Sequence, residues 1–450
     1  MPQDLLIGDI FRNAARAVPD RVAVAVGSAT LTFGELDRAA NRIARSLSLN
    51  VGDRVVVQRD ADLSVAPLFA ALAKLGAVFV PVSPLLAEAE LRPILDVAQP
   101  AVLIRDGEAV EDVAGDESDV GSSVAERDPH VVFFTSGSTA RPKGVVLSHR
   151  TNFLRSHPGA QLEPRGAMVC PYPLFHMAAW TIALQQWQAR DRVVFLQSAD
   201  AATIGAAVLE HRAARLNCIP AVWRRLLEPP AVDLSSLRFA DTGTSATPPE
   251  LLAAIAARCP DAEVRVFYGS TEAGNVASLD HADISRKPGS VGVPSPLTWV
   301  RVASDGELHV RGPLLFDGYL GEPDPFVDGW YATGDLVDVD DEGYLSIVGR
   351  SRDVIRTGGE TVAPAEVEAV LARCAGVADV AVIGVPDATW GEVVCAVVVG
   401  RVTLQDVRAH CEGELASFKH PRRLEVVDEI PRTSSTGQVQ RRLLVEWFSA

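Results

Sequence analysis

The chain has 450 residues, which is enough for two or three domains with large hydrophobic cores. Its formal charge of −16 argues against nucleic acid or an anionic membrane as the main partner, because both would repel it. Asp4 and Asp9 interrupt the first apolar residues and no apolar run is long enough to span a bilayer, so we expect no signal peptide and a cytoplasmic protein.

The N-terminal third has the pattern of an α/β domain. Thr32 and Glu35 form a capping box that predicts the start of a helix. Apolar residues then recur at helical spacing and should pack inward, namely Leu36, Ala40, Ile43 and Leu47. Apolar runs at 54–58 and 76–82 alternate with helical segments, as in a parallel sheet. The acidic residues 106–129 predict a solvated connection to the next strand.

A polar loop follows the apolar run 131–134 and reads Thr-Ser-Gly-Ser-Thr-Ala-Arg-Pro-Lys-Gly over residues 135–144. Small residues let backbone N–H groups face phosphate oxygens, hydroxyls add donors, and Lys143 adds a mobile positive charge. A Walker A loop is excluded, because six residues separate Gly137 from Gly144 and glycine follows the lysine. The segment predicts a polyphosphate-binding loop, with an ordinary polar turn as the alternative.

The pattern changes in the second half of the chain. Residues 290–348 contain short strands with turns, which suits a small β-subdomain. After a polar break at 350–353 the chain restarts with a helix at Pro364, whose apolar face is formed by Val367, Val370 and Leu371. Strands are expected at 377–385, 393–399 and 424–427. We therefore predict a large α/β domain followed by a compact α+β unit.

Five further segments accompany the phosphate loop. They read Pro-Leu-Phe-His at 173–176, Tyr-Gly-Ser-Thr-Glu at 268–272, Gly-Trp-Tyr-Ala-Thr-Gly-Asp at 329–335, Gly-Arg-Ser-Arg-Asp at 349–353, and Gly-Gly-Glu at 358–360 with Pro-Ala-Glu-Val-Glu at 364–368. Together these motifs resemble the acyl-adenylate-forming (ANL) superfamily of acyl- and aryl-CoA synthetases, peptide-synthetase adenylation domains and luciferases. The chain is shorter than we expect of that family, which suggests trimmed surface loops.

The resemblance implies a fold and an activity. The expected fold has an N-terminal adenylate-forming domain, residues 1–350, and a mobile C-terminal domain, residues 351–450, with a hinge near Arg352. The expected chemistry is attack of a carboxylate on the α-phosphate of ATP, which gives an acyl-AMP and pyrophosphate, followed by displacement of AMP by the thiol of coenzyme A. This first step needs charge neutralisation and in-line positioning, with ATP and Mg²⁺.

The resemblance also assigns roles to residues that bind the nucleotide. Lys143 and the loop should hold the β- and γ-phosphates, and Glu272 should contact Mg²⁺. Asp335 should accept hydrogen bonds from the ribose hydroxyls, and Arg350 should reach the ribose and phosphate. The alternatives are that Glu272 caps the start of a helix and that Asp335 and Arg350 form a turn salt bridge. The remaining expected nucleotide-binding residues are Thr135, Ser136, Gly137, Ser138, Thr139, Gly243, Thr244, Ser245, Tyr268, Gly269 and Thr271.

Other residues concern the acid and the thiol. His176 resembles the family's gate between acyl pocket and thiol channel, although a satisfied structural histidine is the alternative. Residues 175–180 contain no carboxylate to pair with an ammonium group, so an acyl or aryl acid is favoured over a free amino acid. Gly358 and Gly359 would line the pantetheine tunnel. Arg352 stands where the family usually has aspartate or lysine.

The largest departure lies at Gln438. The family's last motif, Pro-x4-Gly-Lys, ends in a lysine that binds the carboxylate and α-phosphate, whereas this chain reads Pro-Arg-Thr-Ser-Ser-Thr-Gly-Gln from Pro431 and is one residue longer. Only four of 42 basic residues are lysines, so background drift would have given arginine. Three explanations are open. The protein has lost or rerouted adenylation, Lys419 or a nearby arginine takes over the role of the missing lysine, or Gln438 is an engineered replacement. Ala140, where glycine is usual, is a lesser departure.

The sequence thus predicts an ATP-dependent acyl- or aryl-CoA ligase with adenylation impaired at Gln438. Alternatives are loading of a carrier-protein phosphopantetheine arm, an impaired homologue that binds nucleotide or acyl-AMP, and, more remotely, a luciferase-like oxygenase. Six cysteines without Cys-x-x-Cys spacing favour free thiols in a reducing compartment over a zinc site.

Overall fold

The computed structural model describes residues 4–108, 115–121, 123–135, 142–157, 166–357, 360–387, 389–433 and 437–448. Two compact units divide the chain. The first spans Met1–Gly289, Pro294–Trp299 and Arg311–Tyr331, and the second spans Ser290–Val293, Val300–Val310 and Ala332–Ala450. The small β-sheet therefore belongs mainly to the second unit, and a boundary at residue 350 with a hinge at Arg352 stays a prediction.

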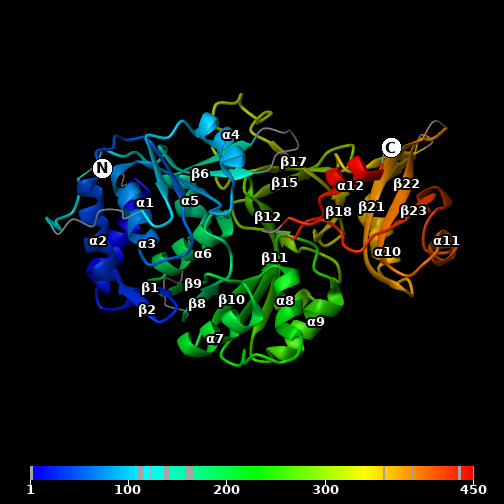
Figure 1. Cartoon of the computed structure of the whole chain (residues 1–450), viewed down its shortest axis with the longest axis horizontal. Coiled ribbons are helices and arrows are strands. Elements are labelled where there is room, and N and C mark those ends of the chain that lie inside the picture. The colour runs from blue at the N-terminus through cyan, green and yellow to red at the C-terminus, as the bar shows by residue number, and fades with distance from the viewer. Residues whose placement is uncertain are drawn as a thin grey trace. The chain divides into compact units, whose positions relative to one another are not determined.

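The first unit contains two sheets over its described residues (Figure 1). In the smaller sheet β3 pairs in parallel with β4 and β5, and β4 with β6, whereas β6 and β7 form an antiparallel hairpin. In order across the sheet, its strands are β5 (Val102–Arg105), β3 (Arg54–Gln58), β4 (Val78–Val82), β6 (Pro129–Thr135) and β7 (Lys143–Ser148).

The larger sheet is parallel in its centre, with antiparallel pairs at β12–β13 and β1–β2. Its strands in spatial order are β14 (Val293–Pro294), β13 (Gly274–Leu279), β12 (Glu263–Ser270), β11 (Phe239–Gly243), β10 (Arg215–Cys218), β8 (Met168–Cys170), β9 (Val193–Phe195), β1 (Val22–Val26) and β2 (Ala29–Thr32). The carboxyl ends of β11 and β12 thus meet at one edge, where ligands of α/β sheets usually bind.

Helices cover these sheets (Figure 1). They are α1 (Ile7–Ala17), α2 (Phe33–Ser46), α3 (Val65–Leu75), α4 (Glu88–Ala98), α5 (His149–Arg155), α6 (Met177–Gln188), α7 (Ala201–His211), α8 (Pro220–Leu227) and α9 (Pro249–Arg258), with a 3₁₀ turn η1 (His281–Asp283). The predicted capping box at Thr32 and Glu35 is confirmed at the start of α2. Of the predicted apolar face, Leu36, Ala40 and Ile43 are buried, and Leu47 is partly buried.

The predicted strand at 76–82 begins two residues later, at Val78. Gly76 instead ends α3 in the left-handed conformation, with φ of +75°. A Cβ at this position would lie 2.7 Å from Val124, so both the backbone angle and the space require glycine.

The described part of segment 106–129 is largely exposed, as expected of a solvated connection. Its residues 115–121 are nevertheless held by arginines from two helices. Arg12 of α1 donates to Asp119 at 2.7 Å, and Arg42 of α2 donates to Glu117 at 2.5 Å. The acidic composition therefore serves local ion pairing as well as solvation.

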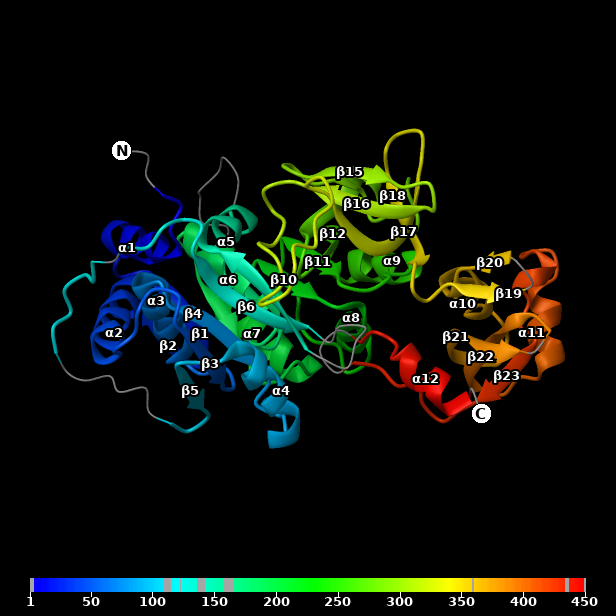
Figure 2. The ribbon, with the colours of Figure 1, turned by 90° about the horizontal axis from the view of Figure 1, so that it is seen from above.

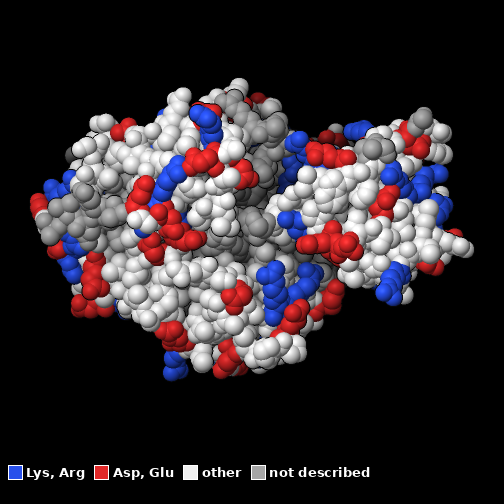
Figure 3. Space-filling view, viewed as in Figure 1, with Lys and Arg blue, Asp and Glu red and all other residues white. Residues whose placement is uncertain are grey.

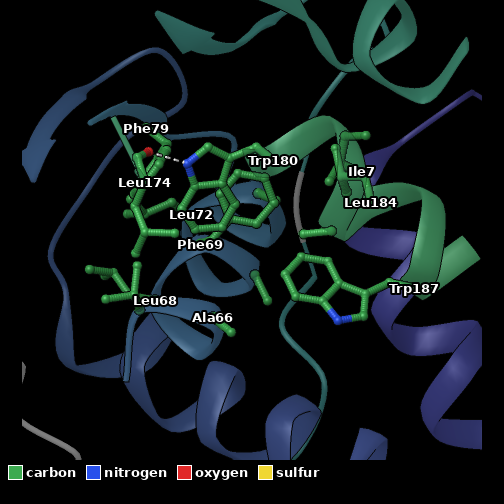
Figure 4. Close-up of a cluster of buried hydrophobic side chains, with 14 of the residues drawn as sticks. Ile7, Ala66, Leu68, Phe69, Leu72, Phe79, Leu174, Trp180, Leu184 and Trp187 are labelled. Carbon is green, nitrogen blue, oxygen red and sulfur yellow. Dashed lines mark hydrogen bonds between the residues drawn. The ribbon is translucent and has the colours of Figure 1, made fainter. Parts of the chain in front are cut away.

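A large aromatic core joins α3 and α6 (Figure 4). The indole of Trp180 stacks on Phe69, with ring centroids 4.2 Å apart and planes 15° apart, and Phe79 meets Trp180 edge-on at 4.8 Å. Trp180 Nε1 donates to the carbonyl of Leu174 at 2.6 Å. This core fixes the N-terminal end of α6 and the segment that precedes it.

The second unit contains a four-stranded sheet, as predicted for the β-subdomain, and a five-stranded sheet. The four strands in order are β15 (Trp299–Val302), β16 (Glu307–Arg311), β17 (Tyr331–Val339) and β18 (Leu345–Arg350). The five are β20 (Glu360–Val362), β19 (Ile355–Thr357), β22 (Gly391–Gly400), β21 (Val377–Asp387) and β23 (Arg423–Val426), which pairs with β22. The helices are α10 (Pro364–Leu371), η2 (Ser417–Lys419), α11 (Leu404–Cys411) and α12 (Arg441–Phe448).

Both faces of the five-stranded sheet are buried. Alternate residues of β21 face opposite sides, as a strand requires. Val380 and Val382 pack with α10 and α11, whereas Ala381 and Ile383 pack with Leu444 of α12. Figure 2 shows α11 and α12 on opposite sides of the sheet. The predicted helix at Pro364 and the three predicted strands are confirmed.

Two observations concern the whole described chain. All six cysteines are free and buried. In the residues that the structure describes, no helix combines the length and the apolar character needed to cross a membrane.

Candidate active site

The ends of the predicted phosphate loop lie side by side. Thr135 ends β6 and Lys143 begins β7, and the two residues are paired across the hairpin. Ser136, Gly137, Ser138 and Thr139 lie outside the described residues. Lys143 therefore lies directly opposite Thr135, the last residue of β6 before the loop.

A segment distant in sequence runs alongside β7. The N–H of Val146 donates to the carbonyl of Gly318 at 3.0 Å, and the N–H of Leu320 donates to the carbonyl of Gly144 at 2.8 Å. These bonds fix the backbone of Tyr319 next to the beginning of β7.

Lys143 has two neighbours from this segment. Its Nζ lies 3.2 Å from the carboxylate of Glu322 and 4.7 Å from the ring centroid of Tyr319. The side chain is 29 % exposed, so the ammonium group remains accessible from solvent. Lys143 is therefore oriented by a carboxylate and by an aromatic face.

Glu272 lies in the turn between β12 and β13. The hydroxyl of Tyr319 donates to its Oε1 at 3.1 Å and also lies 3.2 Å from the hydroxyl of Tyr331. Burial, together with the negative charge of Glu272, raises the pKa of Tyr319 above its ordinary value. The two residues that the sequence singled out for phosphate and metal, Lys143 and Glu272, thus meet the two ends of one tyrosine.

A buried arginine holds the backbone of the Glu272 turn. Arg155, at the end of α5, donates to the carbonyls of Thr271 at 2.8 Å, Glu272 at 2.6 Å and Leu314 at 2.7 Å. Burial lowers its pKa to about 10, so it is still charged at neutral pH. Because charge-assisted hydrogen bonds are strong, this contact should hold Thr271 and Glu272 in place.

At glycines, the carboxyl end of β11 closely approaches β12, and that of β12 closely approaches β13. A Cβ on Gly243 would lie 2.3 Å from the carbonyl oxygen of Phe267, and one on Gly269 would lie 1.9 Å from that of Gly274. Thr244 follows with φ of +67°, which is costly for a β-branched residue and typical of functional loops. Ser245 continues this turn, and Tyr268 lies on the adjacent strand.

A buried ion pair supports these two strands. Asp241 of β11 is 1 % exposed and pairs with Arg265 of β12 through two bonds of 2.8 and 2.9 Å. It is two residues from Gly243, so it fixes the strands just before the predicted nucleotide loop.

His176 occupies the N-cap of α6. Its Nδ1 accepts a hydrogen bond from the N–H of Ala178 at 3.2 Å, and its ring stacks on Tyr172 with centroids 5.6 Å apart. Burial lowers its pKa to about 4, so the imidazole is neutral at physiological pH. The capping bond gives His176 a structural role, and its role as a gate stays a prediction.

In the second unit Asp335 and Arg350 lie opposite each other on β17 and β18. Arg350 Nε lies 2.6 Å from Asp335 Oδ1, and the side chain of Asp335 is 6 % exposed whereas that of Arg350 is 38 % exposed. Thr333 Oγ1 accepts a hydrogen bond from the Asp335 N–H at 3.1 Å. The structure thus brings these two predicted nucleotide-binding residues together as an ion pair with one solvent-facing partner.

Gln438 lies on an exposed turn near the C-terminus. Its carbonyl accepts from the N–H of Thr433 at 2.8 Å, and Gly437 before it has φ of +68°. Arg432, on the same turn, donates to the carbonyl of Gly437 at 3.1 Å and pairs with Asp379 at 2.8 and 2.9 Å. Backbone hydrogen bonds therefore hold position 438 in place, but its glutamine side chain carries no charge.

The structure describes two of the four remaining residues that the sequence analysis singled out in this unit. Lys419 forms an ion pair with Glu366. Arg352 is exposed, with its Nε 3.7 Å from Asp353. Gly358 and Gly359 lie outside the described residues.

Comparison with known proteins identifies the family. The sequence model described as AMP-binding enzyme matches residues 11–320, and the AMP-binding enzyme C-terminal domain matches residues 366–436. The chain belongs to the AMP-binding enzyme family. This membership confirms the resemblance to the ANL superfamily on which the expected fold and chemistry were based.

Two relatives illustrate the match of this AMP-binding enzyme along its whole length. The long-chain-fatty-acid–CoA ligase FadD13 of Mycobacterium tuberculosis is 32 % identical, with 99 % of each chain covered. The feruloyl-CoA synthase of an Amycolatopsis species is 34 % identical, with 95 % of this chain and 97 % of that protein covered. The AMP-binding enzyme described here is accordingly an AMP-forming acid–thiol ligase.

Solved structures agree on the fold. The ATP-bound MatB from Rhodopseudomonas palustris has a TM-score of 0.89 at 27 % identity, covering 98 % of this chain and 99 % of that one. A fatty acyl CoA synthetase from Mycobacterium tuberculosis has a TM-score of 0.80 at 29 % identity, covering 99 % and 98 %. The predicted α/β class with a separate small domain is confirmed.

Three residues around this site were missed from the sequence. Lys143 is contacted by Glu322 and Tyr319, and the Glu272 turn is contacted by Tyr319 and Arg155. Each of these contacts joins residues that are separated by many tens of positions in the sequence. No local spacing marks them, since each acts through a tertiary contact. Only the Gly-Tyr pair at 318–319, in a polar stretch between strands, offered a weak signal.

Proposed function

We propose that this enzyme joins an acyl or aryl carboxylic acid to coenzyme A through an acyl-AMP. A carboxylate oxygen attacks the α-phosphorus of ATP and pyrophosphate leaves. The thiol sulfur of coenzyme A then attacks the acyl carbon, AMP leaves, and the thiol proton passes to solvent. The observation that carries the proposal is the convergence of Lys143 and Glu272 on Tyr319 in a chain of this family.

Lys143 would hold the β- and γ-phosphates and Glu272 would bind Mg²⁺. The metal would neutralise phosphate charge and orient the pyrophosphate leaving group. Glu272 fits a hard cation, because Tyr319 engages Oε1 while Oε2 has no hydrogen-bond donor within the described residues. A metal ligand needs such an available oxygen, held by a fixed backbone, which Arg155 supplies.

The ribose of ATP would be held by Asp335. Its carboxylate can accept two hydroxyl donors, and Arg350 already orients it. The adenine would lie near Tyr268 and the turn formed by Gly243, Thr244 and Ser245, of which Thr244 and Ser245 are partly exposed. Close strand approach at Gly243 supports this assignment.

The acid would be apolar or aromatic. The segment 175–180 carries no carboxylate, so an α-ammonium group would be buried without a partner. His176, within this segment, is neutral at physiological pH and therefore adds no charge. Relatives named for a long-chain fatty acid and for ferulate are of this chemical kind.

Gln438 would weaken the first half-reaction. A neutral amide cannot neutralise a carboxylate and an α-phosphate that converge on it, and such losses commonly cost about a hundredfold in rate. The cations considered as substitutes are engaged elsewhere, Lys419 with Glu366 and Arg432 with Asp379. We therefore favour slow adenylation with the thiol step intact.

Two finer proposals concern the acceptor and the compartment. Coenzyme A is preferred over a carrier-protein phosphopantetheine arm, because the relatives aligned over nearly the full length are named as CoA ligases. A reducing, cytoplasmic compartment is supported by six free buried cysteines.

The test is pyrophosphate release with ATP, Mg²⁺ and a panel of aliphatic and aromatic acids, for the protein and for Gln438→Lys. We expect the lysine variant to release pyrophosphate about a hundredfold faster with the preferred acid. Equal rates would mean that another cation serves, and Lys419→Ala and Arg432→Ala would identify it. Adding coenzyme A or a holo carrier protein to the responsive acid distinguishes the acceptors. No release from either protein would contradict ligase activity on these acids.

A further inference from the structure

Tyr319 connects the two residues proposed to bind the triphosphate and its metal. Its ring lies beneath the Lys143 ammonium group, 4.7 Å from Nζ, and its hydroxyl lies 3.1 Å from Glu272 Oε1. Lys143 begins β7, whereas Glu272 lies between β12 and β13, so the two come from different sheets. One side chain thus spans the gap between a cation and a carboxylate.

The side chain of Tyr319 is held from several directions. Its backbone runs alongside β7 through the hydrogen bonds at Gly318 and Leu320. Its ring meets Phe316 edge-on, with centroids 4.8 Å apart and planes 69° apart, and Phe316 in turn packs against Tyr331 at 5.1 Å. Because ring and backbone are both fixed, the hydroxyl has a defined position relative to Glu272.

The direction of the hydrogen bond follows from the chemistry of the two groups. A carboxylate oxygen can only accept, so the Tyr319 hydroxyl donates to Glu272 Oε1. A donor on Oε1 restricts rotation of the carboxylate and leaves Oε2 available to a cation. Metal ligands are commonly oriented by hydrogen bonds of this kind.

The ring acts on the other partner. A cation above an aromatic face is attracted by the ring quadrupole, and the attraction does not consume any of the three ammonium hydrogens. Lys143 can therefore exchange its contact with Glu322 for a phosphate oxygen while remaining over Tyr319.

We propose that Tyr319 is a positioning residue that sets the geometry of both Glu272 and Lys143 toward a metal–triphosphate. The inference rests on the proposed roles of those two residues. The hydroxyl acts on the metal ligand and the ring acts on the lysine, so the two functions are separable by substitution.

The experiment is calorimetric titration of ATP into the full-length protein, with and without Mg²⁺. The proteins are wild type, Tyr319→Phe, Tyr319→Leu, Glu272→Gln and, as a matched control, Tyr331→Phe, which removes the neighbouring hydroxyl without removing a donor to Glu272. Calorimetry reports affinity for the folded fraction, so a loss of stability alone changes the apparent number of sites and leaves the affinity ratio unchanged.

We expect Tyr319→Phe to reduce the gain in affinity that Mg²⁺ confers by about tenfold, while binding of ATP without metal changes less than twofold. Tyr319→Leu should also weaken binding without metal by about threefold, because the ring is lost. Tyr331→Phe should leave both affinities within twofold of wild type.

Two outcomes would overturn the inference and can be told apart. If Glu272→Gln loses the Mg²⁺-dependent gain but Tyr319→Phe retains it, Tyr319 has no positioning role and the proposed site stands. If Glu272→Gln binds MgATP as wild type does, the proposed metal ligand is wrong and the inference fails with it.

Discussion

At the scale of single residues, Lys143 shows how a cation proposed to bind phosphate is kept oriented. Its ammonium group contacts Glu322, an exposed carboxylate, and the face of Tyr319. An exposed ion pair of this type contributes at most about 1 kcal/mol, which a triphosphate can readily replace. The contact therefore positions the lysine without blocking it, although it should reduce affinity for phosphate slightly.

Removal of that competing carboxylate should strengthen ATP binding. We expect Glu322→Gln to lower the dissociation constant for ATP by about threefold, measured by calorimetry at low ionic strength. Asp324→Asn, at an exposed acidic residue two positions away, is the matched control and should have a smaller effect. A weaker affinity for Glu322→Gln would indicate that Glu322 contributes to the site directly.

Gly243 is a residue whose identity is set by the opposite strand. A Cβ would lie 2.3 Å from the carbonyl oxygen of Phe267, a backbone atom that cannot move away independently. We expect Gly243→Ala to lower the free energy of unfolding by about 2 kcal/mol or more and to weaken ATP binding. Urea unfolding and calorimetry measure these effects. Gly121→Ala, where no atom lies within 4 Å of the added Cβ, should change neither.

At the scale of elements, the junction of β6 and α5 buries two histidines. His130 and His149 have ring centroids 4.8 Å apart, and the Nε2 atom of each has no hydrogen-bond partner within the described residues. Asn152 contacts His130 Nδ1, and the N–H of Ile7 donates to His149 Nδ1. Burial lowers the pKa of His130 well below its ordinary value and that of His149 to about 4, against a small opposing effect of Asp128.

This burial makes stability depend on pH. Between pH 4 and 6.5 the unfolded chain takes up a proton at His149 that the folded chain does not, so stability falls as the pH falls through this range. We expect His149 alone to lower the free energy of unfolding by about 2 kcal/mol from pH 7 to pH 5.

The measurement is urea unfolding at both pH values, followed by tryptophan fluorescence, since Trp180, Trp187 and Trp223 are buried in the first unit. His149→Asn should reduce the difference between the two pH values. His157→Asn, at an exposed histidine, should leave it unchanged. If His149→Asn lost as much stability between pH 7 and pH 5 as the wild type does, the pH dependence would arise from other groups.

At the scale of the whole molecule, the two units carry different parts of the proposed site. Lys143, Glu272 and Tyr268 belong to the first unit, whereas Asp335, Arg350 and Gln438 belong to the second. Under the proposed assignments, both units contribute residues to adenylation. On the face drawn in Figure 3, acidic and basic side chains are interspersed, and no large basic area dominates among the coloured residues.

Rotation of the C-terminal domain about Arg352 is the proposed route between the two half-reactions. We expect Arg352→Pro, which fixes φ at the hinge, to slow thioester formation at least tenfold while pyrophosphate release stays within threefold. Arg352→Lys is the control, because it retains a polar, flexible residue. Product analysis by chromatography for each half-reaction measures the effect, and equal slowing of both would place the hinge elsewhere.

Much of the fold could be predicted from local signals. The capping box at Thr32, the apolar run in β21 and the proline at the start of α10 each depend on neighbours within a few positions. Errors arose at element ends, such as Gly76, where a left-handed turn replaced the first residues of a predicted strand. There a Cβ would lie 2.7 Å from Val124, which is distant in sequence, so the space available at Gly76 could not be predicted from neighbouring residues.

The sequence by itself determined the family, and it predicted which residues bind a triphosphate, because phosphate and metal chemistry restricts residue types at short spacing. It also marked Gln438 as a departure from that chemistry. Only the tertiary structure decided that Tyr319 lies between Lys143 and Glu272, that Arg155 holds the Glu272 turn, and that two histidines are buried without hydrogen bonds at Nε2. These contacts join segments far apart in the chain, and such pairs are fixed by packing of sheets and helices rather than by local sequence.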